Sequence, residues 1–123
     1  MKRVVGLGGV FFKAKDPKAL YEWYRKHLGI ESVEGAGAMW GDADHPGSNV
    51  FAIFPQTTKY FAPSESSFMI NFRVDNLQEL VKALREEGVP VEKVEEHEYG
   101  KFGWIMDPEG NRVELWEPPK TGG

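Results

Sequence analysis

Glu114 is the carboxylate whose sequence surroundings give it the clearest chemical potential, because it lies in an apolar run between Val113 and Leu115. A carboxylate that faces apolar walls has a raised pKa and can exchange a proton near neutral pH. Glu114 is therefore a candidate general acid or base, or an anchor that accepts hydrogen bonds. The alternative is a structural carboxylate that Arg73 or Lys13 neutralises.

The histidines offer few further sites, and the chain contains no cysteine. Without cysteine there are no disulfides, thiolate nucleophiles or cysteine-ligated metal sites. His27 falls in the last turn of a predicted helix, where a cation suits the helix dipole. His45 follows Asp42 and Asp44 in a loop that could bind a cation, although such loops are more often polar turns. His97 lies in an acidic connection that is typical of a solvated loop.

The elements that would position these groups occur twice, since the two halves of the chain share one pattern. Residues 9–16 match residues 69–76 at an offset of 60 (69 − 9), and both segments alternate as a strand does. Residues 50–55 match residues 113–118 later in each half. The common order indicates a duplicated strand–helix–three-strand unit.

Each first strand leads into an amphipathic helix with its own start and stop signals. Asp16 is a good N-cap before Pro17, and Gly29 ends the first helix. Asn76 caps the second helix, which Gly88 closes. We therefore expect one helix in each half.

Shorter strands are expected after each helix, near 32–34, 38–40 and 50–54 in the first half and at 91–96, 102–106 and 112–117 in the second. The segment 107–111 has the proline and glycine placement of a tight hairpin turn. The polar stretch 55–67 links the halves. The expected organisation is a single domain over 1–123, with module 1 at about 4–55, a linker at about 55–67 and module 2 at about 68–118.

Length and charge limit the classes of function. The chain has 123 residues and a formal net charge of −4, with both signs spread along it. This size suits one domain, and without a basic stripe we expect no nucleic-acid partner. No apolar run approaches the ~20 residues that span a bilayer, and the N-terminus lacks the features of a signal peptide. We therefore expect a cytoplasmic protein without membrane association.

The run 107–118 resembles the C-terminal signature of the glyoxalase / bleomycin-resistance / extradiol dioxygenase superfamily, the vicinal oxygen chelate fold. The opening Lys15-Asp16-Pro17, with Trp23-Tyr24 and Leu28-Gly29, is similar to its first strand and helix. The resemblance covers essentially the whole chain. It implies an α+β fold in which two βαβββ modules form a curved mixed sheet with a cleft and helices on the outer face. It also implies a small-molecule ligand and a homodimer.

In the metal-using members of the superfamily that this chain resembles, the first strand and the last strand of each module each donate one metal ligand. Those positions here are Gly9, Phe51, Met69 and Glu114. Only Glu114 can bind a hard or borderline divalent ion, and a catalytic metal needs at least three protein ligands. The resemblance therefore implies no metal or other cofactor, with a divalent ion held through Glu114 as the alternative.

Period-two alternation also predicts which side chains line the cleft. Together with the aromatic run 99–104, it gives an aromatic and apolar surface with a few polar groups. The expected ligand-binding residues are Phe11, Lys13, Phe51, Ile53, Met69, Asn71, Arg73, Tyr99, Phe102, Trp104 and Trp116. Tyr60 and Phe61 of the linker are candidates for a lid.

Several functions fit these residues. The first is a metal-free protein that binds an aromatic or planar compound. The second is a metal-independent lyase or isomerase with Glu114 as general acid or base. The third is a metalloenzyme with relocated ligands, such as Glu114 with His97 or with groups of a second chain. A fourth is a family member that acts through a protein interface. Lactoylglutathione lyase and extradiol ring-cleaving activities are not expected, because their metal site is dismantled.

Overall fold

The computed structural model describes residues 3–33, 37–40 and 49–119. Within them the chain forms two helices and seven strands, in the order β1 (Val4–Ala14), α1 (Pro17–Leu28), β2 (Ala38–Trp40), β3 (Asn49–Pro55), β4 (Phe68–Val74), α2 (Leu77–Glu86), β5 (Val94–His97), β6 (Gly100–Met106) and β7 (Arg112–Glu117). Near 32–34, the described part of the predicted strand forms only an isolated bridge between Val33 and Gly37. The loop that carries His45 lies outside the described residues.

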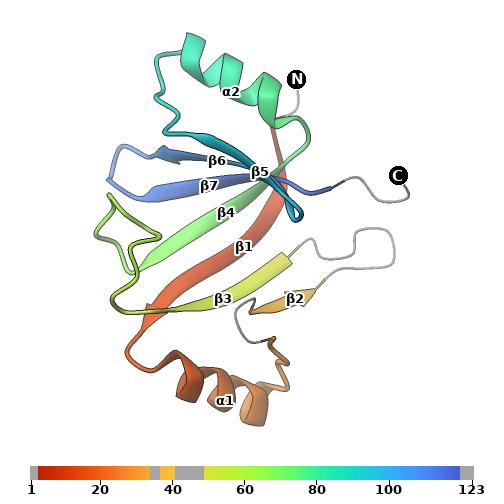
Figure 1. The fold of residues 1–123 in the computed structure, drawn as a ribbon, viewed down its shortest axis with the longest axis vertical. Helices are drawn as coiled ribbons and strands as arrows, with labels where there is room; N and C mark the ends of the chain where they lie inside the picture. The colour runs from red at the N-terminus through yellow and green to blue at the C-terminus, as the bar shows by residue number, and fades with distance from the viewer. Residues whose placement is uncertain (1–2, 34–36, 41–48, 120–123) are drawn as a thin grey trace.

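The strands form one mixed sheet in the order β2-β3-β1-β4-β7-β6-β5. Strand β1 runs parallel to β3, β4 runs parallel to β7, and the antiparallel pair β1–β4 joins the two halves at the centre. Helix α1 contacts β1 and β3, whereas α2 contacts β6 and β7, so the helices lie at opposite ends of the sheet (Figure 1). The predicted α+β fold with a curved mixed sheet is confirmed.

The residues predicted to begin and end the helices form the expected capping contacts. The Asp16 side chain accepts from the Ala19 backbone N–H at 3.0 Å, and Gly29 ends α1 with φ 68°. The Asn76 side chain accepts from the Glu79 N–H at 3.1 Å at the start of α2. Neither described helix, of 12 and 10 residues, is long and apolar enough to cross a membrane.

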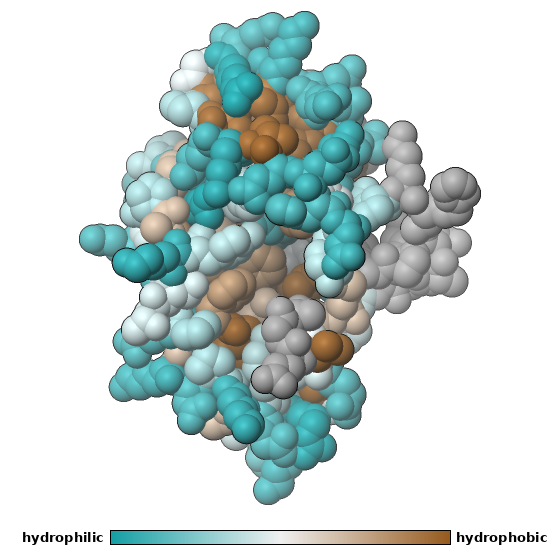
Figure 2. Space-filling model, in the orientation of Figure 1, coloured by the Kyte–Doolittle hydropathy of each residue, from teal (hydrophilic) through white to brown (hydrophobic). Residues whose placement is uncertain are grey.

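The sheet carries apolar side chains on both faces. One buried cluster lies against α2 and comprises Val74, Leu77, Leu80, Val81 and Leu115. The second, which we call the cleft cluster, comprises Phe11, Ala52, Phe61, Met69 and Trp104. Figure 2 shows apolar side chains in a hollow over the middle of the sheet, with polar side chains around them. The cleft cluster is the floor on which the candidate site is built.

Candidate functional site

The side chain of Glu114 is almost completely buried, with 1% of its surface exposed. Its carboxylate accepts three hydrogen bonds, from the Tyr60 hydroxyl, from Asn71 Nδ2 at 2.5 Å and from Trp104 Nε1 at 2.9 Å. The donors come from the linker, from β4 and from β6. The carboxylate predicted as the chemical centre is therefore held in place by three separate parts of the chain.

Strand pairing brings these groups into one row. Strand β7 runs parallel to β4 with Glu114 opposite Asn71, and antiparallel to β6 with Glu114 opposite Trp104. Residues directly opposite each other project from the same face of a sheet. The strand register alone therefore brings together Asn71, Glu114 and Trp104. Tyr60 belongs to the linker instead and bonds to Glu114 from outside these strands.

Burial and hydrogen bonding act on Glu114 in opposite directions. Burial raises the pKa of the Glu114 carboxyl, whereas the bonds from Tyr60, Asn71 and Trp104 and the charge of Arg112 oppose that rise. Burial, followed by the Glu114 charge, raises the pKa of the Tyr60 hydroxyl well above its ordinary value. Tyr60 therefore stays protonated and donates. The cation that acts on Glu114 is Arg112, rather than the predicted Arg73 or Lys13.

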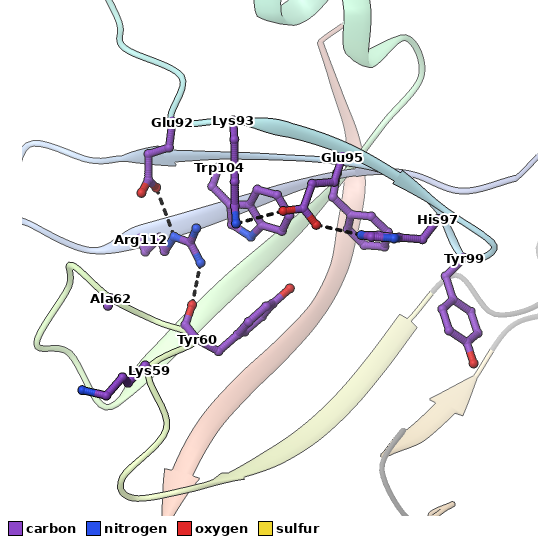
Figure 3. Close-up of a pocket in the computed structure, with 11 residues that line it drawn as sticks. Lys59, Tyr60, Ala62, Glu92, Lys93, Glu95, His97, Tyr99, Trp104 and Arg112 are labelled. Carbon is purple, nitrogen blue, oxygen red and sulfur yellow. Dashed lines mark hydrogen bonds and ion pairs between the residues drawn. The ribbon is translucent and has the colours of Figure 1, made fainter.

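Arg112 is a site residue that sequence reasoning missed. It is 6% exposed, its Nε donates to Glu92 at 3.0 Å, and its Nη1 donates to the Tyr60 carbonyl at 2.5 Å. Its guanidinium lies 5.0 Å from the centre of the Trp104 ring (Figure 3). Its position two residues before Glu114, hence on the same face of β7, was the available signal.

Two cavities border this network. The first, which we call the apolar cavity, has a volume of about 410 Å³ and is lined by Phe11, Tyr21, Gly37, Met39, Val50, Ala52, Ile53, Phe54, Pro55, Tyr60, Asn71, Tyr99, Phe102, Glu114 and Trp116. The second, the hairpin cavity, has about 690 Å³ and is lined by Lys59, Tyr60, Ala62, Glu92, Lys93, Glu95, His97, Tyr99, Phe102, Trp104 and Arg112 (Figure 3). Tyr60, Tyr99 and Phe102 border both.

Aromatic rings of β6 and β7 form a continuous stack between these cavities. The ring of Phe102 lies 6.2 Å from that of Trp104 at 15°, and 6.3 Å from that of Trp116 at 8°. Trp116 Nε1 donates to the Tyr99 carbonyl at 2.8 Å. The structure thus brings together the four aromatic residues that were predicted at this end of the cleft.

The prediction that Phe51 faces the cleft is wrong. In the parallel pairing Ala52 lies opposite Phe11, as Glu114 lies opposite Asn71, so the predicted register was off by one residue. The Phe51 ring contacts Tyr24 of α1 at 5.0 Å, on the other face of the sheet. Ile53 borders the apolar cavity at the edge of β3, where its N–H donates to the Tyr21 hydroxyl at 2.7 Å.

Linker residues cover part of the predicted cleft. Phe61 is fully buried in the cleft cluster with Met69, and the Lys13 ammonium lies 5.5 Å from the centre of its ring. Met69, Lys13 and Arg73 line neither of the two cavities. Arg73 lies against Gly6 in β1 instead. These three residues were predicted to contact the ligand, but the structure places them away from both spaces.

The described residues do not fit the metal site of the metal-using members. With the corrected register, the four positions hold Gly9, Ala52, Met69 and Glu114, and the Glu114 carboxylate is already occupied by three donors. Within 3–33, 37–40 and 49–119, no group of three or more His, Cys, Asp or Glu could hold a metal ion. His97 pairs with Glu95 at 2.8 Å and borders the hairpin cavity, whereas Glu114 borders the apolar one.

Gly9 occupies its position because no side chain fits there. A Cβ atom would lie 2.4 Å from the backbone oxygen of Val50 in the neighbouring strand. We expect Gly9→Ala to lower the free energy of unfolding by about 1–3 kcal/mol, the usual cost of forcing atoms into a packed interior. Urea denaturation measures this difference. Gly103→Ala is the control, since its nearest neighbour is a Leu77 methyl at 3.5 Å, and equal losses in both variants would contradict the argument.

Comparison with known proteins agrees with this architecture. The model of the family described as Glyoxalase/Bleomycin resistance protein/Dioxygenase superfamily matches residues 6–115. No curated protein is similar enough in sequence to count as a relative.

Solved structures share the fold at low sequence identity. Methylmalonyl-CoA epimerase from Mycobacterium tuberculosis is 22% identical with a TM-score of 0.64, and 95% of this chain covers 90% of that one. A variant of the Streptomyces coelicolor epimerase, in complex with 2-nitronate-propionyl-CoA, is 19% identical with a TM-score of 0.69. The match covers 98% of this chain and 99% of that chain. A catechol 2,3-dioxygenase is 20% identical with a TM-score of 0.67, and 98% of this chain spans 41% of it. At such identities the likeness establishes the fold alone.

Proposed function

Because the chain belongs to the glyoxalase/bleomycin resistance protein/dioxygenase superfamily, we propose that it is a metal-free protein that binds an aromatic or planar small molecule in the apolar cavity. The observation that carries this proposal is the state of Glu114. Of the four family metal positions, only Glu114 has a suitable ligand atom. Its carboxylate is buried and accepts three hydrogen bonds. A metal ion would have to displace those donors and would find too few further ligands.

The walls of the apolar cavity support a planar ligand. The rings of Phe11, Phe54, Phe102 and Trp116 line it, with Asn71 and Glu114 as polar groups at its floor. Concave spaces of this size, mostly apolar with a few fixed polar groups, are typical small-molecule sites. Flat rings gain stacking contacts against such walls.

The test compares two half-buried phenylalanines of the sheet. Phe102 borders both cavities, whereas Phe51 faces α1. We expect Phe102→Leu to weaken the binding of naphthalene by up to about tenfold, since an aromatic contact is worth about 0.5–1.5 kcal/mol. Phe51→Leu should leave the affinity unchanged. Quenching of tryptophan fluorescence during a naphthalene titration measures both variants.

Two results would contradict this proposal. One is equal weakening by Phe51→Leu and Phe102→Leu, which would place the ligand elsewhere. The other is stoichiometric iron, manganese, nickel or zinc in protein purified without chelators, together with loss of naphthalene binding in EDTA. We expect the affinity to be the same with and without EDTA.

Proton transfer by Glu114 is the second candidate function. It is favoured because Glu114 borders the apolar cavity and burial raises its pKa, which brings the carboxyl closer to neutral pH. In that case Glu114→Gln abolishes exchange of solvent deuterium into a bound carbonyl compound while its affinity changes little. Equal exchange in the variant and in the wild-type protein would exclude this function.

A further inference from the structure

Tyr60 belongs to the linker, yet its ring is seated in a slot on the cleft face of the sheet. The ring stacks on Phe54 with centroids 5.5 Å apart and planes 4° apart, and lies edge-on to Trp104 at 6.4 Å and 88°. Its hydroxyl donates to Glu114 at the end of the slot. The chain therefore already holds one phenol by ring contacts along its length and by an acceptor at its tip.

The same ring separates the apolar cavity from the hairpin cavity. Tyr60 borders both spaces, and Figure 3 shows its ring extending from the linker across the space in front of β1 and β4. Its surface is 37% exposed, so the slot is not sealed. Removal of the ring from the slot would open Glu114 to both cavities at once.

Arg112 fixes the backbone of Tyr60 directly, and its guanidinium also lies 5.8 Å from the centre of the Tyr60 ring. The Tyr60 carbonyl accepts from Arg112 at 2.5 Å, and Arg112 in turn is fixed by Glu92 at 3.0 Å. The side chain depends on ring contacts and on the bond to Glu114. Rotation about χ1 moves the ring out of the slot while the linker stays in place, a motion that exposed side chains undergo readily.

The three donors on Glu114 differ in how easily they can be replaced. Asn71 and Trp104 project from paired strands, so their displacement would disturb the sheet. Tyr60 can be replaced without such a change. The incoming group must itself donate a hydrogen bond, because a carboxylate only accepts and a buried one that loses a partner is destabilised.

We propose that the ligand takes the place of the Tyr60 ring, and that it is a planar aromatic compound carrying a hydroxyl or N–H donor that bonds to Glu114. This inference rests on the proposed function and names the chemical class of its ligand. Tyr60 then acts as an internal competitor, so that flat apolar compounds bind more weakly because they cannot offer Glu114 a replacement for the lost hydrogen bond.

The experiment compares 2-naphthol with naphthalene and with 2-methoxynaphthalene. Of the three, only 2-naphthol carries a hydrogen-bond donor. We expect the wild-type protein to bind 2-naphthol about tenfold more tightly than the other two, the usual effect of one hydrogen bond to a charged acceptor. Tyr60→Phe keeps the stacked ring but removes the competing hydroxyl. It should tighten the binding of 2-naphthol and of naphthalene by a similar factor of about ten, because neither compound then has to displace a hydroxyl from Glu114.

Tyr24→Phe is the control, because Tyr24 packs against Phe51 on the helix side of the sheet and borders neither cavity. It should leave all three affinities as they are in the wild-type protein. Equal affinities for the three compounds, with no gain in Tyr60→Phe, would overturn the inference and leave the proposed function intact. Absence of binding for all three would contradict both. The wild-type comparison needs no variant, so it decides the preference even if Tyr60→Phe folds poorly.

Discussion

Replacing Glu114 with alanine is expected to lower the free energy of unfolding by about 3 kcal/mol or more, since a buried donor left without its acceptor costs about 1–3 kcal/mol. Three donors lose their acceptor together, from Tyr60, Asn71 and Trp104. Water from the apolar cavity can satisfy the outermost donor, so the cost is less than three full penalties. Chemical denaturation followed by tryptophan fluorescence measures the change.

Glu109→Ala is the control for this prediction, because Glu109 is an exposed carboxylate in the turn between β6 and β7. Its loss should change the stability by no more than about 0.5 kcal/mol. If Glu114→Ala destabilises the protein as little as the control does, the three hydrogen bonds are not formed in solution, and the proposed displacement of Tyr60 loses its basis.

The difference in stability between the wild-type protein and Glu114→Ala should depend on pH in a defined direction. Burial raises the pKa of Glu114 above its ordinary value of 4.5, so the folded state favours the protonated carboxyl. This contribution is fully present below the unfolded pKa and is lost as the pH rises through the folded pKa. The stability difference between the wild-type protein and Glu114→Ala is therefore expected to be largest in acid and to shrink above pH 4.5. A difference that grows with rising pH would contradict the assigned direction.

How far the sequence predicts this structure depends on whether the signal is local. The helices were predictable because Asp16 and Asn76 cap the residues immediately following them, and the bonds are formed as expected. Strands β4 and β7 were equally clear, since polar residues such as Asn71 and Glu114 alternate with apolar ones and distinguish the two faces.

Strand β3 lacked that alternation, which explains the error at Phe51. Residues 50–54 are all apolar, so either set of alternate side chains could face the cleft. The choice is made by pairing with β1, a contact between segments about 40 residues apart in the chain (51 − 10 = 41). A shift of one residue moves every side chain of the strand to the other face. The corrected register adds no metal ligand, because Ala52 has no more donor atoms in its side chain than Phe51 has.

The linker was predicted only as a connection with Tyr60 and Phe61 as a candidate lid, because nothing local marks its residues as part of the core or as donors to Glu114. Tyr60 and Phe61 lie in a polar stretch with turn signals, which favours a surface connection. The structure instead uses Tyr60 as a donor to Glu114 and buries Phe61 completely. Both roles depend on the position of the linker over the sheet, which alternation within a strand cannot indicate.

Phe61→Ala is accordingly expected to be among the most damaging substitutions, with a loss of about 3–5 kcal/mol in the free energy of unfolding. Phe61 is 0% exposed, its ring packs on Phe54 at 5.2 Å, and it joins the cluster of Met69 and Trp104. Truncation removes a large apolar side chain and leaves a void in a cluster whose other members come from strands that cannot collapse inward. Urea denaturation provides the measurement.

Phe68→Ala separates this packing effect from the general loss of an aromatic residue. Phe68 begins β4 just after the linker, but its side chain is 40% exposed, so its truncation creates no enclosed void and should cost far less. If the linker were only a connection between modules, the two substitutions would have similar effects, and that result would overturn the placement of Phe61. A large loss confined to Phe61→Ala would instead mean that the linker completes the core, so that the floor beneath Tyr60 and Glu114 depends on a segment outside both repeats.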